Sequence, residues 1–539
     1  MLNGMVQRAE RARADRLIRG QVERIEAYLD SITPTPELPG APVLVFNAST
    51  RIQSLSLNAA FSLLASWSMR SAGVPVRYLV CREGMLQCML GTQWSNLDQP
   101  PPCKECIRFG EKILPSRLST SMRLNRGLIR RLELELEARS LDELSDWRFE
   151  DLPIGELCLP TVRWALRRHD LYDDRAARGL FRQYLLSAAS LAEWFRSTFA
   201  ELEPRALVVF NGITYPEAVA RAMALRLGIP VTTHEVGLRA LSAFFSHEHA
   251  TFREVDLPEE SSLEPDWSQV LDAYLEDRGQ GRFSMAGVRF WPEIEPIPAK
   301  LKVSMQAYRQ EIPIFTNVIF DTSQVHANSI FEHMFEWLDA VGELTADYPE
   351  TLFVIRAHPD ENRPGKESRQ TVADWFESSG LLDQPNVTFI GPDERVSSYE
   401  LIERSSFVLV YNSSVGLEAS IQGKAVLCAG RARYTQANTV FMPSDKAEYF
   451  RQLESMLESS SIEAPPEFAE NGRRFLYQEL FRSSIDLSDF LIPYPSLPGM
   501  VLLRDFEPQA LKEHPALEAI RRGVLDGATF ATEPRVSTS

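Results

Sequence analysis

Short apolar runs that alternate with stretches of helical spacing constrain the fold of this chain most. In the first half, such runs occur at residues 41–49 (APVLVFNAS), 74–81 (VPVRYLVC), 205–212 (RALVVFNG) and 229–237 (IPVTTHEVG). Apolar runs without polar alternation are typical of strands covered on both faces, and strands that alternate with helices form parallel sheets. The first half of the chain therefore predicts an α/β domain.

The same alternation returns in the second half of the chain. Strands are expected at 312–321, 351–360, 386–391, 407–414 and 424–430, with helices from Ser329 to Thr345, near Ser398 to Ser405 and from Val415. In such doubly wound sheets, ligands bind at the carboxyl ends of the strands. We expect an α/β protein with two Rossmann-like domains that face each other across a cleft.

Composition shifts along the chain suggest where these domains begin and end. Apolar residues recur at spacings of three and four between about 124 and 202, which is typical of helices, whereas residues 256–298 are rich in Pro, Glu and Ser. The predicted parts are an N-terminal helical segment (1–38), a Rossmann-like acceptor domain (39–255) with a helical insertion (about 110–203), an interdomain connection (256–300), a Rossmann-like donor domain (301–485), and a C-terminal segment with a flexible tail (486–539).

Charge and hydropathy limit the partners of the chain. Its 57 Lys and Arg residues against 74 Asp and Glu residues give a formal charge of −17, which repels nucleic acids. Neither a membrane-spanning run nor an apolar leader is present, so we expect a cytoplasmic protein. The N-terminal helix is expected to pack on the protein's own surface; docking at the inner face of the membrane is the alternative. Its apolar positions are Leu17, Ile18, Val22, Ile25 and Leu29.

A His-Pro pair follows the expected strand at 351–356. The sequence IRAHPDE places His358 at the mouth of the second sheet, and Pro359 fixes the turn that aims the imidazole. A histidine there can donate a hydrogen bond to a phosphate or to a base carbonyl. The alternative is a loop histidine whose hydrogen bonds go to backbone carbonyls.

A second polar group follows the expected strand at 407–411. Asn412, Ser413 and Ser414 come directly before a helix, so hydroxyls and free backbone N–H groups meet at a site suited to phosphate. Ser414 could instead serve as an ordinary helix N-cap. Glu418 lies one turn further on and suits the hydroxyls of a ribose, with a solvated helix glutamate as the alternative.

Together these motifs resemble bacterial capsule-polysaccharide biosynthesis glycosyltransferases, whose relatives include Kdo transferases and bacterial sialyltransferases that use CMP-sugars. The resemblance covers about residues 312–440 and includes the stretch TNVIFDTSQVHAN. It implies the GT-B architecture, with His358 also in a catalytic role. It implies that His358, Ser413 and Ser414 contact the nucleotide and its phosphate. The full set of predicted donor-binding residues is Asn317, Asp321, Arg356, His358, Asn412, Ser413, Ser414 and Glu418.

The function that this resemblance implies is transfer of a sugar from a nucleotide-sugar to a surface polysaccharide or a lipid-linked glycan. The helix that carries Glu418 lacks a second glutamate seven or eight residues later, which favours a CMP-sugar over UDP- or GDP-hexoses. Transfer is expected to need no cofactor, because hydrogen bonds and the helix dipole can stabilise the leaving phosphate. A UDP-sugar epimerase of the same architecture and a non-catalytic polysaccharide-assembly subunit are the alternatives.

Polar residues also follow the strands of the first domain. Asn47, Arg51, Asn211 and His234 are expected on the acceptor side of the cleft. Glu235 is the predicted general base, which would take the proton of the acceptor hydroxyl during displacement at the anomeric carbon. The alternative is that His234 and Glu235 only close their strand.

Four cysteines lie close together in the sequence. Cys81, Cys88, Cys103 and Cys106 could hold a structural zinc, because four thiolates leave no open position for a substrate. Disulfides are not expected, because the sequence shows no leader that would direct it to an oxidising compartment. Free cysteines and an iron–sulfur cluster are the alternatives.

Overall fold

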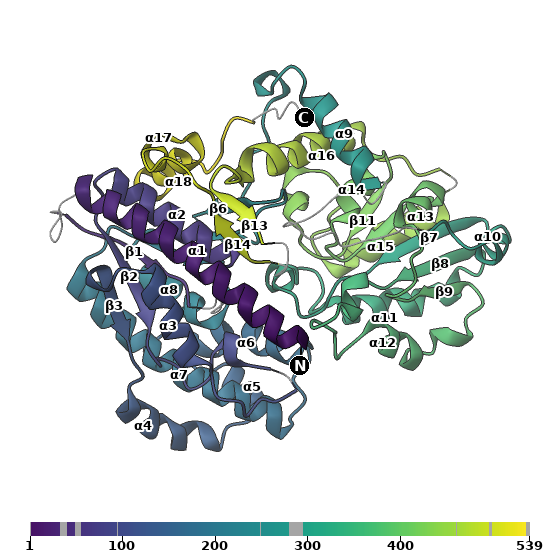
Figure 1. The fold of residues 1–539 in the computed structure, drawn as a ribbon. Coiled ribbons are helices and arrows are strands. Elements are labelled where there is room, and N and C mark those ends of the chain that lie inside the picture. Colours follow the sequence, from purple (N-terminus) through teal and green to yellow (C-terminus); the bar gives the residue numbers. More distant parts are fainter. Residues whose placement is uncertain are drawn as a thin grey trace.

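The computed structural model describes residues 2–32, 40–48, 55–93, 95–247, 249–279, 295–459, 461–494 and 499–534. Two α/β lobes lie side by side (Figure 1). The first contains the elements up to residue 246, and the second contains residues 267–279 and most of the elements that follow residue 295. The last elements of the chain return to the first lobe.

The first lobe is built on a twisted sheet with a parallel centre. Across the described residues it has seven strands in the order β12-β6-β5-β4-β1-β2-β3; β6 runs antiparallel to β5, and β12 antiparallel to β6. The strands are β1 (Val43–Phe46), β2 (Val76–Cys81), β3 (Ser119–Met122), β4 (Ala206–Phe210), β5 (Val231–Val236), β6 (Ser242–Ser246) and β12 (Ile485–Asp486).

Both faces of this sheet are covered, which explains its uninterrupted apolar runs. In β1, Leu44 and Phe46 pack into one core, and Val43 and Val45 pack into another on the opposite face. The first core is closed by α4 (Arg126–Glu137), α5 (Leu141–Ser145), α6 (Ile154–Leu166), α7 (Arg175–Leu202) and α8 (Tyr215–Arg226), and the second by α1 (Leu2–Ile32), α2 (Leu57–Ser71), α3 (Cys103–Ile113), α17 (Ala510–Glu513) and α18 (Pro515–Asp526).

The helical insertion expected at about 110–203 contains a strand. Residues Ser119–Met122 form β3, which pairs in parallel with β2 from Tyr78↔Ser119 to Cys81↔Met122. Its sequence, STSM, has no apolar run because β3 is an edge strand whose residues are largely half-buried. The helices of the insertion therefore begin only at α4.

The second lobe has a purely parallel sheet. Across the described residues its five strands follow the order β11-β10-β7-β8-β9. Ile312 and Ile314 enter one core, while Leu352 and Val354 enter another on the other face. The strands are β7 (Gln310–Phe315), β8 (Thr351–Arg356), β9 (Val387–Ile390), β10 (Val408–Val410) and β11 (Val426–Cys428). Two Rossmann-like sheets in two lobes confirm the predicted α/β, GT-B-type fold class.

Helices cover this second sheet as well. The helix expected from Ser329 begins only at Met334, because His333 is extended and its Nδ1 accepts the hydrogen bond of Glu336 N at 3.2 Å. The helices of the second lobe are α9 (Trp267–Gly279), α10 (Ala299–Met305), α11 (Met334–Leu344), α12 (Val372–Ser378), α13 (Ser398–Arg404), α14 (Val415–Ile421), α15 (Lys446–Glu458) and α16 (Pro466–Tyr477).

The segment expected as an interdomain connection contains α9, which packs on the second lobe. Leu271 is fully buried in the core that also holds Leu476, and Arg473 of α16 donates to Ser268 Oγ at 2.8 Å. The high Pro, Glu and Ser content concealed this helix. Residues 280–294 lie outside the described residues.

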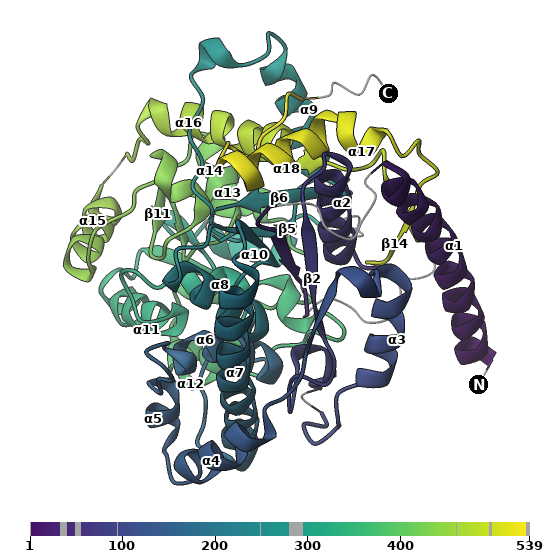
Figure 2. The same ribbon diagram turned by 90° about the vertical axis from the view of Figure 1, so that its left-hand side faces the viewer.

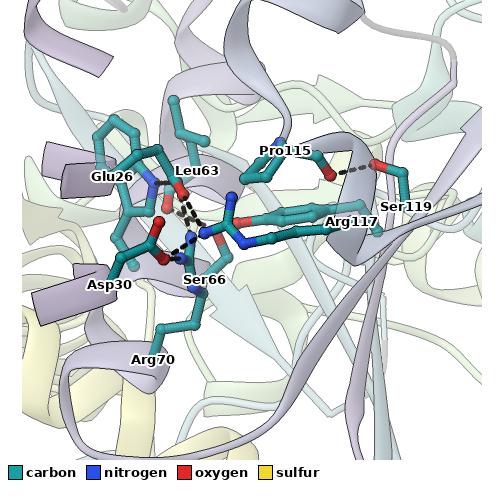
Figure 3. A network of polar contacts seen from close by, with 10 residues as sticks. Glu26, Asp30, Leu63, Ser66, Arg70, Pro115, Arg117 and Ser119 are labelled. Carbon is teal, nitrogen blue, oxygen red and sulfur yellow. Dashed lines mark hydrogen bonds and ion pairs between the residues drawn. The ribbon is translucent and has the colours of Figure 1, made fainter. Parts of the chain in front are cut away.

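The N-terminal helix α1 packs on α2 and is held there by ion pairs (Figure 3). Glu26 accepts hydrogen bonds from Trp67 Nε1 at 2.9 Å and from Arg70 Nη1 at 2.6 Å, and Asp30 pairs with Arg117. Four of the five apolar positions predicted for this helix are buried, and Leu17 remains 50% exposed. None of the described helices is long and apolar enough to cross a membrane.

The C-terminal segment returns to the first lobe instead of forming a separate unit. After β12 it forms the antiparallel pair β13 (Leu491–Pro493) and β14 (Val501–Leu503), and then α17 and α18, which pack on α2 (Figure 2). Thr532 N still donates to Arg482 O at 2.9 Å. Of the tail that we expected to be flexible, residues 535–539 lie outside the described residues.

Candidate active site

The carboxyl ends of β10, β7 and β8 meet at one edge of the second sheet. Because these strands are neighbours and parallel, the loops that follow them bring Asn317, His358 and Asn412 to the same edge. Thr316 joins two of the loops: its Oγ1 donates to Arg356 O at 3.1 Å and accepts from His358 N at 3.1 Å. Residues that are far apart in the sequence thus form one polar edge.

His358 is oriented by the turn that follows it. Its Nδ1 accepts a hydrogen bond from Asp360 N at 3.1 Å, so the neutral ring carries its proton on Nε2. Burial lowers the pKa of His358, and Asp360 and Asp321 offset part of this effect. At neutral pH, His358 can therefore donate from Nε2 to a phosphate oxygen.

Asn317 and Asn412 tie two loops of this edge together. Asn412 N donates to Asn317 Oδ1 at 3.3 Å, Asn412 Nδ2 donates to Ser323 O at 3.2 Å, and Gln324 Nε2 donates to Asn412 Oδ1 at 3.0 Å. Both polar atoms of the Asn412 side chain are engaged. This residue supports the shape of the edge.

The two serines differ in their surroundings. Ser413 is buried, and its carbonyl accepts from Tyr434 Oη at 2.6 Å. Ser414 is exposed, and its side chain makes no cap hydrogen bond, so the N-cap alternative is not what the structure shows. Helix α14 has only seven residues, which makes its dipole a small contribution. The Ser414 hydroxyl faces solvent.

Glu418 is buried and already paired. Its Oε1 accepts from Arg278 Nη2 at 2.6 Å, and its Oε2 accepts from the hydroxyl of Tyr399. The carboxylate is 7% exposed, which excludes the solvated alternative. Arg278 comes from α9, and a ribose would have to share Glu418 with it or displace it.

Arg356 and Asp321 lie on opposite sides of the edge. The Arg356 guanidinium turns toward β9 and donates to Gly391 O and, at 2.7 Å, to Glu394 O; burial lowers its pKa to about 10. Arg356 therefore holds the β9 loop. Asp321 is exposed, and its Oδ1 accepts from Thr322 N at 2.8 Å.

Arg167 was not predicted, yet it reaches this edge from the first lobe. It ends α6 in the left-handed conformation (φ 59°), and its guanidinium lies over the rings of Trp164 at 4.0 Å and of Phe320, in the second lobe, at 5.2 Å. Such a backbone conformation is uncommon outside glycine and is frequent at functional sites. The signal that the sequence offered, one arginine in the run RRH, was too common to use.

The guanidinium of Arg167 is buried without full hydrogen bonding. Its Nε and Nη1 find no partner among the described residues, although Arg167 is only 7% exposed. Burial lowers its pKa, and the charges of Glu367 and Asp321 offset part of this effect. Unpaired N–H donors of a buried cation are suited to an anionic ligand.

Glu235 accepts three hydrogen bonds at the polar edge of the first sheet. Its Oε1 accepts from Val236 N at 2.8 Å and from Asn58 Nδ2 at 3.2 Å, and its Oε2 accepts from Asn211 Nδ2 at 3.4 Å. Burial raises the pKa of Glu235, these three hydrogen bonds lower it, and the charge of Asp321 raises it further. Asp321 belongs to the second lobe, so the two polar edges face each other.

His234 lies behind this edge and not on it. Neighbouring residues of a strand point to opposite faces, so His234 is fully buried while Glu235 is half-buried. Its Nε2 lies 2.7 Å from Ser62 Oγ, and burial lowers its pKa to about 3. The structure thus places His234 beneath the edge, against Ser62, and its acceptor-side role stays a prediction.

Asn47 and Asn211 support the loops of the first edge. Asn47 Nδ2 donates to Ser62 Oγ at 2.8 Å and to Asn58 O at 3.2 Å. Asn211 has a positive φ of 24°, and its Oδ1 accepts from Ile213 N at 2.9 Å. Arg51, the remaining acceptor-side prediction, lies outside the described residues.

Glu217 is a further buried carboxylate that we did not predict. It is fully buried and accepts hydrogen bonds from Ala48 N at 2.7 Å and from Thr214 Oγ1 at 2.8 Å. The pattern Thr-x-x-Glu at the start of α8 was visible in the sequence and is typical of a helix start. Here the glutamate also fixes the loop after β1.

A cavity of about 530 Å³ extends from this edge along β2 toward α3. Asn47 and Ser62 line its polar end, and Tyr78 and Phe109 line its apolar part. It lies on the acceptor side of the predicted arrangement.

The two lobes also meet through pairs of histidine rings. His249 of the first lobe lies 4.5 Å from His326 of the second, and His169 lies 4.7 Å from His333, measured between ring centroids. Among the described residues, His169, Asp170 and His333 are the one group of three possible metal ligands with all ligand atoms within 4.8 Å of one another. These contacts hold the two polar edges opposite each other.

The four predicted metal ligands come together near the first edge. Cys81 ends β2, Cys88 precedes a short 3₁₀ helix, and Cys103 and Cys106 lie in the first turn of α3. All four line one small cavity together with Ala48. Which metal they hold, if any, stays a prediction at this point.

Part of the chain matches the sequence model of a known protein family. Residues 295–438 match the family described as "Capsule polysaccharide biosynthesis protein". No curated protein shows significant sequence similarity to the chain.

Solved structures show only distant likeness. The KpsC β-Kdo 2,4-transferase of Thermosulfurimonas dismutans is 13% identical, with a TM-score of 0.35 over 57% of this chain and 87% of that chain. The β-Kdo 2,7-transferase of the same organism is 14% identical, with a TM-score of 0.31 over 58% and 85%. A UDP-GlcNAc 2-epimerase from Neisseria meningitidis is 13% identical, with a TM-score of 0.22 over 81% and 98%.

At these TM-scores the likeness supports no inference about activity. The family match is independent of it and contains His358, Ser413, Ser414 and Glu418, the residues on which the resemblance was based. The predicted resemblance to the capsule polysaccharide biosynthesis family is therefore confirmed for residues 295–438.

Proposed function

We propose that this protein is a glycosyltransferase that moves a sugar from a nucleotide-sugar, with a CMP-sugar favoured, to a surface polysaccharide or a lipid-linked glycan. The observation that carries this proposal is that Arg167 of the first lobe lies over the ring of Phe320 in the second, at 5.2 Å, with N–H groups unpaired among the described residues; the charge of the next residue, Asp321, acts to raise the pKa of both Glu235 and His358. A candidate base in one lobe and a candidate phosphate donor in the other thus face the same space.

The donor is bound at the second sheet. His358 Nε2–H, the Ser414 hydroxyl and the unpaired N–H groups of Arg167 would hold the phosphate of the nucleotide. A cation and hydrogen-bond donors stabilise the charge that develops on a leaving phosphate, so transfer needs no divalent ion. The single Glu418 and the absence of a second glutamate after it favour a CMP-sugar.

Glu235 acts as the general base. Its carboxylate takes the proton of the acceptor hydroxyl while the hydroxyl oxygen bonds to the anomeric carbon and the bond from that carbon to the phosphate oxygen breaks. Burial raises the pKa of Glu235, which strengthens it as a base. The cavity beside Asn47 leaves room for a glycan or lipid-linked acceptor at the cytoplasmic face of a membrane.

Calorimetric titration tests the donor site. The purified protein is titrated with CMP, CDP, UDP, GDP and their sugar conjugates, and the measurement is repeated on Ser414→Ala and His358→Ala. We expect selective binding of one nucleotide class, with weaker binding in both variants. Binding of none of them would reject the proposal and favour a non-catalytic subunit of polysaccharide assembly.

Product analysis separates transfer from epimerisation. An epimerase would convert a UDP-sugar without any acceptor, whereas the proposed transferase forms a new glycoside and releases the nucleotide. Conversion of the sugar nucleotide alone would therefore reject transfer and leave the donor site in place.

A further inference from the structure

The four cysteines near the first edge are assembled from three separate segments. Cys81 comes from the end of β2, Cys88 from the loop after it, and Cys103 and Cys106 from α3. The chain has six cysteines in 539 residues, and four of them line one small cavity. The other two, Cys158 and Cys428, are buried elsewhere in the two cores. Such convergence from distant positions indicates a shared ligand.

Backbone donors point at these sulfur atoms. Gly84 N donates to Cys81 Sγ at 3.4 Å. The backbone N–H groups of Gly91 and Leu90 are directed at the sulfur of Cys88. A backbone N–H group directed at sulfur stabilises the charged thiolate more than the neutral thiol. This arrangement therefore suits cysteines that bind a metal as thiolates.

The cavity has no cation of its own. Its other lining residues are apolar, apart from Glu83, and no lysine or arginine is among them. A bound metal would supply the positive charge that this lining lacks and would convert the four cysteine thiols to thiolates.

The spacing of the sulfurs distinguishes between two kinds of centre. A single tetrahedral zinc with Zn–S bonds of about 2.3 Å holds its sulfurs about 3.8 Å apart. No three of the four described sulfurs lie within 4.8 Å of one another. An iron–sulfur cluster fills the middle of its site with several atoms, so its cysteines stand further apart.

We propose that Cys81, Cys88, Cys103 and Cys106 hold a four-iron, four-sulfide cluster, and not the single zinc that the sequence favoured. The cluster would join the end of β2, the loop 82–102 and α3. Ala48 lines the same cavity, and its N–H donates to Glu217, the buried carboxylate that fixes the loop after β1. The role of the cluster is structural: it fixes the acceptor-side loops.

Metal and sulfide analysis tests this proposal. The full chain is produced with iron and purified without oxygen, and iron, zinc and acid-labile sulfide are measured together with the visible absorption spectrum. We expect about four iron atoms and four sulfides per chain and the broad visible absorption of a cluster. One zinc per chain without iron, or no metal at all, would overturn the proposal.

Matched variants assign the metal to these residues. Cys103→Ser/Cys106→Ser should lose the iron and the visible absorption, whereas Cys158→Ser and His333→Ala should retain both. Iron that survives in the double variant would place the cluster elsewhere. If the double variant does not fold, exposing the wild-type protein to air and a chelator is the second measurement. Its visible absorption should bleach and its melting temperature should fall; no change in either would also contradict the proposal.

Discussion

The polar edges of the two sheets each contain a glutamate, but the two carboxylates have different partners. In the first lobe, Glu235 is held by the amides of Asn58 and Asn211 and by one backbone N–H, and no cation pairs with it in the described part of the chain. In the second lobe, Glu418 is paired with Arg278 and bonded to Tyr399. Neutral amide donors lower the pKa of a carboxylate only modestly. A paired arginine compensates the negative charge of the carboxylate and favours its ionised form.

This difference matches what each edge would bind under the proposed function. A general base needs a raised pKa, and burial without a cation provides it. A phosphate site cannot tolerate an unpaired carboxylate nearby, because the two negative charges repel each other. Arg278 removes that repulsion, and the free N–H groups of Arg167 add attraction. Under the proposed function, the first edge is suited to take a proton and the second to receive an anion.

Glu235→Gln removes the base and keeps the shape of the first edge. We expect kcat to fall by about 10²- to 10⁴-fold, with little change in donor affinity, because proton transfer is lost and the second edge is untouched. A transfer assay measures the rate, and calorimetry measures donor binding. In the wild type, the rate should fall as the pH drops through the raised pKa of Glu235. An unchanged kcat would remove Glu235 from the mechanism.

Arg167→Met tests whether the second edge is completed by a cation from the first lobe. We expect kcat to fall by about 10²- to 10³-fold, because one donor to the leaving phosphate is lost. The melting temperature should stay unchanged, because the Nε and Nη1 groups of Arg167 make no hydrogen bond to a described residue that the substitution could break.

Arg168→Met is the matched control for this prediction. Arg168 is the next residue and is paired with Asp174 at 2.8 Å, so its loss should lower stability and leave donor binding intact. If Arg168→Met weakens donor binding and Arg167→Met does not, the assignment of Arg167 to the donor site is wrong.

Arg278→Met leaves Glu418 buried, with the hydroxyl of Tyr399 as its remaining side-chain partner among the described residues. Removing one member of a buried ion pair costs about 3–5 kcal/mol of unfolding free energy. Arg278→Met/Glu418→Gln should recover much of this loss, because no uncompensated charge is left. Denaturant unfolding measures both variants. Equal losses in the two variants would show that Arg278 contributes by packing and not by its charge.

The sequence predicted the second edge better than the first for a physical reason. His358, Ser413 and Ser414 follow their strands directly, so strand order alone brings them together. Glu235 also ends a strand, but His234 beside it points to the other face, and a strand boundary of uncertain register does not distinguish the two.

The partners of these residues could not be predicted. Arg278 lies in α9, in a segment whose composition predicted an interdomain connection. Arg167 belongs to the first lobe and contacts Phe320 of the second. Such contacts depend on how helices pack, which periodicity does not reveal. The strand β3 was missed for a related reason: an edge strand does not need an apolar run.

Acidification should affect the first lobe more than the second. Burial lowers the pKa of His234 and of His249 to about 3; burial also lowers the pKa of His358 in the second edge, but there the charges of Asp360 and Asp321 offset part of the effect. A histidine with a lowered folded-state pKa is protonated first in the unfolded chain, so its stabilisation is complete above pH 6.5 and is lost as the pH falls.

Between pH 6.5 and 5, each such histidine should cost about 2 kcal/mol of unfolding free energy. Denaturant unfolding across this range measures the slope, and His249→Gln should remove its share because glutamine does not titrate. His358→Gln is the matched control in the second edge and should change the slope less. If His358→Gln flattens the slope as much as His249→Gln does, the neighbouring carboxylates do not protect His358, and the two edges do not differ in their response to protons.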